Sequence, residues 1–149
     1  MLRISKMSDY GIVVLTQMVR MAHRCVHPAT ELAEETRIPL PTVQKVLKVL
    51  ARDGLVVSMR GARGGYALAD DPARVDLVRV LDCLEGPVAL TDCAAHGEGC
   101  SEEAWCHVAP HWMVINRAVR TALQGVTLLE VARGAPRREG RAMKVAEGA

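Results

Sequence analysis

The sequence of 149 residues predicts a mainly α-helical domain that carries one small β-hairpin. Apolar residues recur at helical spacing between residues 41 and 52, and a shorter helical segment at 31–36 precedes them. Two short apolar segments, 55–58 and 66–68, flank a glycine-rich turn and read as paired strands. A short helix, a tight turn, a second helix and a hairpin together predict a winged helix-turn-helix, which a longer C-terminal dimerisation helix would extend.

The first helix is expected between residues 9 and 23, with Ser8 as its N-cap. Its apolar side chains cover more than one face, which is typical of a helix that is buried on two sides. One side can pack on its own domain and the other on a second subunit. Asp9 lies in the first turn, where a carboxylate complements the helix dipole.

The segment from residue 41 to 53 is expected to form a helix with a polar and basic outer face. Pro41 suits a first helical position, and Gly54 suits the residue just past the end. The polar side chains of the outer face are Thr42, Gln44, Lys45, Lys48 and Arg52. In a helix-turn-helix this second helix enters the DNA major groove. A solvated face in any small α protein is the alternative reading.

The hairpin that follows has two arginines, Arg60 and Arg63, among the glycines of its tip. Glycines let the backbone approach a phosphate chain or let an arginine enter a minor groove. Residues 37–63 carry six basic side chains against one acid, whereas residues 64–110 carry two against nine. The first stretch is therefore expected to face a polyanion, which favours DNA binding over a solvated surface.

Three of the five cysteines, Cys93, Cys100 and Cys106, lie within fourteen residues. Two glycines and the lack of any apolar period predict a loop in which the sulfurs can converge. From Asp92 to Cys106 there are four carboxylates and no lysine or arginine, so bare thiolates are disfavoured, whereas a bound cation or cluster supplies positive charge. Because the cysteine spacings are wider than those of zinc knuckles, an iron-sulfur cluster is preferred, with zinc and redox thiols as alternatives.

The other two cysteines, Cys25 and Cys83, are expected to be small buried apolar residues. Asp76 can cap a helix at 77–84, which leads into the cysteine loop. Thr127 and Glu130 form a capping box for a last short helix.

A longer helix is expected at 110–124. Its apolar stripe consists of Trp112, Ile115, Val119 and Leu123. Such a stripe on a terminal helix needs a partner, and a second copy of the same helix would give a symmetric homodimer.

The expected organisation is a winged helix-turn-helix domain at 1–86, a cysteine cluster-binding loop at 87–110, a dimerisation helix and short terminal helix at 111–132, and a disordered tail at 133–149. Polar residues interrupt the N-terminal apolar run, and no clean cleavage site follows, so a cytoplasmic protein without a membrane segment is expected. The motifs do not assemble a nucleophile, a base and an oxyanion site, so no enzymatic activity is expected.

The chain resembles the Rrf-type winged-helix regulators of bacteria, from residue 1 to about residue 132. The resemblance rests on residues 2–10, on Leu40-Pro41-Thr42-Val43, on the wing Arg60-Gly61-Ala62-Arg63-Gly64-Gly65-Tyr66, and on the three cysteines after the fourth helix. Residues 85–93 and 115–119 are similar to those of regulators of the SUF iron-sulfur assembly operon. The resemblance implies a homodimer that binds a palindromic operator in double-stranded DNA, senses cluster status and represses SUF genes.

The cluster ligands that the resemblance implies are Cys93, Cys100 and Cys106. IscR-like members take a fourth ligand from a histidine three residues later, but that position holds Ala109, and His107 is the nearby, less favoured substitute. NsrR-like members use an aspartate of the other subunit at the start of the first helix, a position that Asp9 matches. One oxygen ligand would hold its iron weakly, which favours a 4Fe-4S cluster over 2Fe-2S. A zinc-binding or thiol-responsive regulator and a nitric-oxide sensor are the alternatives.

Overall fold

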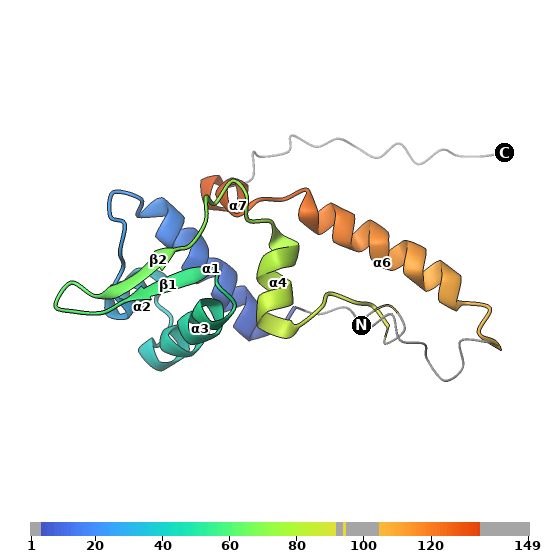
Figure 1. Cartoon of the computed structure of the whole chain (residues 1–149), viewed down its shortest axis with the longest axis horizontal. Coiled ribbons are helices and arrows are strands. Elements are labelled where there is room, and N and C mark those ends of the chain that lie inside the picture. The colour runs from blue at the N-terminus through green and yellow to red at the C-terminus, as the bar shows by residue number, and fades with distance from the viewer. Residues whose placement is uncertain (1–3, 92–93, 95–104, 135–149) are drawn as a thin grey trace.

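A computed structural model describes residues 4–91, 94 and 105–134 of the chain (Figure 1). Its elements follow the predicted order: α1 (Lys6–Arg20), α2 (Ala29–Thr36), α3 (Leu40–Arg52), β1 (Val56–Met59), β2 (Gly65–Leu68), α4 (Leu77–Glu85), α6 (Ala109–Gln124) and α7 (Leu128–Arg133). The two strands pair antiparallel, with Val56 opposite Leu68 and Met59 opposite Gly65. The winged helix-turn-helix that the sequence predicts is confirmed.

The start of α1 differs from the prediction, because Ser5 and not Ser8 is its N-cap. The Ser5 hydroxyl accepts a hydrogen bond from the Ser8 amide at 3.2 Å, and Ser8 itself is fully buried in the first turn. The amide of Ser5 also donates to the Glu85 carboxylate at 2.8 Å, which joins the start of α1 to the end of α4. A long-range anchor of this kind leaves no mark in the local sequence pattern.

One hydrophobic core joins the first four helices, the hairpin and α7. In α3 the buried positions recur at helical spacing, so one face of the helix packs inward while the opposite face stays exposed. The fully buried large side chains of the core are Val14, Leu15, Met18, Leu32, Val43, Val46, Leu47, Leu50, Val56, Val80 and Leu128.

Helix α6 projects from this core, and the chain then returns to it as α7, which packs on α1 (Figure 1). The return is fixed by backbone hydrogen bonds: Leu77 N donates to Val126 O at 3.0 Å, and Leu128 N donates to Val75 O at 2.8 Å. The predicted capping box of Thr127 and Glu130 is present and begins α7. Within the described residues, no helix is both long and apolar enough to cross a membrane.

Candidate DNA-binding surface and cysteine loop

The outer face of α3 carries the polar side chains that the sequence places there. Gln44, Lys45 and Lys48 are exposed, and Thr42 is half-buried near the start of the helix. Neither lysine forms a salt bridge with a described carboxylate, so both charges are available to a polyanion. Pro39 is the N-cap residue of α3, and no side chain accepts a hydrogen bond from the first turn at this position.

The turn between α2 and α3 contains Arg37, which is exposed and has a left-handed backbone with φ of 58°. Among the described residues it is the only non-glycine with positive φ, a conformation that costs on the order of 1 kcal/mol. The Thr36 hydroxyl braces this turn, because it donates to Leu32 O at 2.6 Å and accepts from Ile38 N at 3.4 Å. Sequence reasoning counted Arg37 in the basic stretch but did not predict its left-handed backbone.

The wing is held by a backbone pairing that the sequence does not reveal. His27, in the loop between α1 and α2, exchanges backbone hydrogen bonds with Tyr66 at 2.8 and 2.9 Å. A Cβ atom at Gly65 would lie 2.5 Å from His27 O, so only glycine allows this approach. The tip, with Arg60 and Arg63, stays exposed beyond the paired region. Helix α3 is followed by a short turn and then by β1, the first strand of the wing (Figure 1). The recognition helix and the wing are therefore joined directly in the chain.

Only one of the three predicted cysteine ligands lies among the described residues. Cys93 and Cys100 lie outside the described residues. Cys106 is half-buried just before α6, and His107 beside it is exposed. Among the residues that are described, no three His, Cys, Asp or Glu side chains form a group that could hold a metal ion.

Asp9 is exposed and lines an open hollow of about 630 Å³ at the start of α1, together with Ile4 and Lys6. In Figure 1 the beginning of α6 is the end of that helix that points away from α1. The first turn of α1, which contains Asp9, and the start of α6, which follows Cys106, therefore lie apart within one chain.

The remaining cysteines differ from the expectation of two buried side chains. Cys25 is exposed, because α1 ends at Arg20 and Cys25 falls in the loop after it. Cys83 is half-buried in α4, and its thiol lies 3.9 Å from Val49 O. Burial, followed by the nearby Asp53 carboxylate, raises the pKa of the Cys83 thiol to about 12, so it stays protonated and unreactive.

Three polar side chains hold the segment that leads toward Cys93, and sequence reasoning missed all three as functional residues. Asp82, on α4, accepts a hydrogen bond from Val88 N at 2.7 Å. Arg120, on α6, binds both carboxylate oxygens of Asp82 at 3.0 and 3.2 Å and donates to Val88 O at 3.3 Å. Asn116 Oδ1 accepts from Leu90 N at 3.1 Å. We call Asp82, Asn116 and Arg120 the loop anchor.

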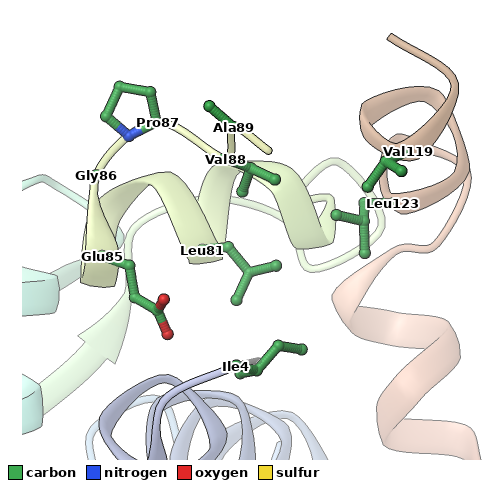
Figure 2. A pocket seen from close by; sticks show the side chains of 9 residues that line it. All are labelled: Ile4, Leu81, Glu85, Gly86, Pro87, Val88, Ala89, Val119 and Leu123. Carbon is green, nitrogen blue, oxygen red and sulfur yellow. The ribbon is translucent and has the colours of Figure 1, made fainter. Parts of the chain in front are cut away.

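The predicted stripe of α6 is divided between two environments. Val119 and Leu123 face an apolar cavity of about 210 Å³ between α6 and α4, which Leu81 and Ile4 also line (Figure 2). Most apolar side chains of the first half of the helix are uncovered in the single chain, where Ile115 is 45% exposed and Val114 68%. Half of the stripe therefore packs within its own subunit.

An exposed polar and basic helix, preceded by a short helix and followed by an arginine-tipped hairpin, defines a winged-helix transcriptional regulator that binds DNA. The chain belongs to the Rrf2 family of iron-dependent transcriptional regulators, whose family model matches residues 4–134. The resemblance on which the sequence analysis relied is thus confirmed.

Two curated relatives and one solved structure illustrate this membership. The chain is 29% identical over 134 residues to an HTH-type transcriptional regulator of Mycobacterium tuberculosis, with 90% of this chain and 83% of the relative covered. It is 25% identical over 131 residues to the regulator IscR of Aliivibrio salmonicida, with 87% and 77% covered. It also matches the structure of CymR, the global cysteine regulator of B. subtilis, with a TM-score of 0.72, 25% identity and coverage of 89% and 98%.

Proposed function

We propose that this protein is a homodimeric regulator whose affinity for a palindromic operator depends on a bound iron-sulfur cluster, and that it represses SUF cluster-assembly genes. The observation that carries the proposal is the chemistry of the cysteine segment in a family described as iron-dependent. Three thiols share that segment with four carboxylates and no lysine or arginine. The cationic core of a cluster offsets the charge of the thiolates that bind it, whereas the carboxylates would repel free thiolates. A regulator of this kind would act in the cytoplasm.

The proposed ligands are Cys93, Cys100 and Cys106, with Asp9 of the partner subunit as the fourth. Support for Asp9 comes from its exposure in an open hollow and from its place in the first turn of α1, which lies apart from the start of α6 within one chain (Figure 1). His107 is the less favoured fourth ligand, since nothing in the described residues directs it toward Cys106. A carboxylate oxygen binds iron less firmly than a thiolate, which suits a labile 4Fe-4S cluster better than 2Fe-2S. When bound, the cluster supplies positive charge that deprotonates and orders the three thiols.

The proposed dimer joins two copies through the first half of α6. Its exposed apolar side chains, Trp112, Met113, Val114 and Ile115, are consecutive in the sequence and point to different sides of the helix, so this end of α6 is apolar nearly all round. Exposed apolar surface of this kind on a single chain is a common sign of a protein interface. A twofold axis there would present two recognition helices to a palindrome.

The side chains proposed to contact DNA are Thr42, Gln44, Lys45 and Lys48 of α3 and Arg60 and Arg63 of the wing. On α3 the polar side chains can reach base edges in the major groove, while the lysines also neutralise phosphates. The wing arginines can follow the backbone or enter the adjacent minor groove.

A thiol- or zinc-responsive regulator is the second candidate, which the similarity to the cysteine regulator CymR favours. Anaerobic purification followed by visible spectroscopy and by iron, sulfide and zinc analysis separates the two. Brown protein that contains iron and sulfide supports the cluster, whereas colourless protein that contains zinc supports the alternative. Titration of labelled operator with both forms at one stated salt concentration then tests regulation. Equal affinities of the cluster-loaded and cluster-free dimers contradict cluster-controlled binding to that operator.

A further inference from the structure

The loop anchor ties the last described residues before Cys93 to two helices at once. Val88 N and O are held by Asp82 and Arg120 respectively, and Leu90 N is held by Asn116. The backbone at Val88 and Leu90 is thus fixed relative to both α4 and α6, and Leu90 precedes Cys93 by three positions in the sequence.

Asn116 is the key member of the loop anchor on α6. It is only 7% exposed, although it lies directly beside Ile115 and Arg117, which are exposed. Its side-chain oxygen accepts the Leu90 amide, and a buried polar group that loses its partner is costly. Arg120 lies one helical turn further on, so both side chains project from one face of α6. A shift of the segment at 88–90 therefore disturbs α6 and the loop together.

On α4 the loop anchor is next to the recognition helix. Asp82 is adjacent in sequence to Cys83, whose thiol contacts Val49 O in the last turn of α3. Helix α4 also packs against α3 and α1, and its last residue, Glu85, holds the amide of Ser5. A displacement of Asp82 is thus passed by direct contacts to the end of α3 and to the start of α1.

We propose that Asp82, Asn116 and Arg120 are positioning residues that transmit the ligation state of the cysteine loop to the recognition helix. This inference rests on the proposed function. Ligation of Cys93 would fix the direction in which the segment at 88–90 runs. Because the loop anchor binds this segment to α4 and α6, that direction would determine how α6, α4 and α3 lie relative to one another. Without the anchor, the loop and the DNA-binding surface would respond independently.

The test uses full-length Asn116→Leu and Asn116→Asp dimers, prepared with and without the cluster. Leucine removes the acceptor for the Leu90 amide at similar volume, whereas aspartate keeps an oxygen in its place beside Arg120. The quantity measured is the ratio of operator dissociation constants of the cluster-free and cluster-loaded forms. Coupling of the usual size gives a ratio of ~5 to 150 in the wild type. We expect Asn116→Leu to bring the ratio close to one and Asn116→Asp to preserve it.

Arg120→Lys provides a second variant that keeps the charge. A lysine is a single point donor and cannot hold both Asp82 oxygens together with Val88 O, so the ratio should fall here too. Arg117→Lys, at an exposed neighbouring position, is the matched control and should leave the ratio unchanged. Iron content, thermal midpoint and the operator affinity of the cluster-free form are measured for every variant. The thermal midpoint should fall in Asn116→Leu and Arg120→Lys, because each variant leaves a hydrogen-bond partner unsatisfied. Iron content and the operator affinity of the cluster-free form should remain near wild type, because only transmission is removed.

The outcomes separate this inference from the proposed function. A wild-type ratio that persists in both Asn116→Leu and Arg120→Lys overturns the role of the loop anchor alone. Equal affinities of the two wild-type forms overturn cluster control, and the transmission with it. A ratio lost equally in Asn116→Leu and Asn116→Asp overturns the assignment to the Leu90 hydrogen bond.

Discussion

At the scale of single residues, the three cysteines that the structure describes occupy three different environments. Cys25 is exposed in a loop, Cys83 has a thiol whose pKa is raised to about 12, and Cys106 is half-buried beside α6. Only the last adjoins the acidic segment that the proposed cluster would occupy. The environment of each thiol, and not the number of cysteines, therefore distinguishes a candidate cluster ligand from a cysteine outside the proposed site.

Replacing Cys106 with alanine should remove most of the bound iron, because a cluster that loses one of three thiolates keeps too few strong ligands. Iron and sulfide per dimer, measured after anaerobic purification, check this expectation. Cys25→Ala is the control and should retain the wild-type visible spectrum. Equal iron content in Cys106→Ala and wild type would remove Cys106 from the ligand set.

His27 is the buried titratable residue at the base of the wing, and burial lowers its pKa from the ordinary value of 6.5. The unfolded chain then binds a proton at higher pH than the folded chain does. The free energy of unfolding should therefore fall as pH drops below about 6.5, with His27 contributing at most ~1.4 kcal/mol per pH unit. Urea unfolding of wild type and His27→Gln between pH 7.5 and about 5 tests this, and identical pH slopes would contradict it.

At the scale of elements, the wing should contribute DNA affinity without affecting the cluster. Arg63→Ala should weaken operator binding of both forms and reduce the salt slope by about one, since one phosphate contact is lost. Titrations at several salt concentrations measure the slope. Arg133→Ala, at the exposed end of α7, is the matched charge control. A loss of affinity in only one of the two forms would place Arg63 in the switch instead.

The first half of α6 should control dimer assembly. Val114→Glu places a charge in the exposed apolar patch and should raise the dimer dissociation constant about 10- to 100-fold, the equivalent of one buried valine. Analytical ultracentrifugation measures the constant. Gln124→Glu, exposed at the far end of the same helix, should change little. An unaltered constant in Val114→Glu would move the interface elsewhere.

The accuracy of sequence reasoning depended on how far apart the interacting residues lie along the sequence. Local signals located the apolar stripe of α3, the Asp76 cap and the Thr127 capping box, because each is made by neighbours in sequence. Contacts between distant residues were missed. The bond between Asp82 and Arg120 joins positions 38 apart, and no local pattern marks it. Ser5 displaced Ser8 as a cap because Glu85, 80 positions away from Ser5, holds the start of α1.

At the scale of the whole molecule, the proposed cluster site would be shared between subunits. Mixed dimers of Asp9→Ala and Cys106→Ala chains test this directly. If Asp9 acts in trans, the mixed dimer contains one intact site and should hold about half of the wild-type cluster with wild-type stability. If Asp9 acts on its own chain, no site is intact. Cluster loss rates of tagged, purified mixed dimers decide between the two.

The docking of α7 on α1 has a consequence for how the regulator is made. Leu15 and Leu128 belong to the same core, yet every residue between them must be translated before they can meet. A nascent chain that stops in the cysteine segment would leave the α7 side of α1 uncovered, and its unfinished core would expose apolar surface. Premature termination should therefore yield fragments that are degraded and not fragments that occupy the operator. Only a completely synthesised polypeptide, which also contains the segment with the proposed ligands, would compete for DNA.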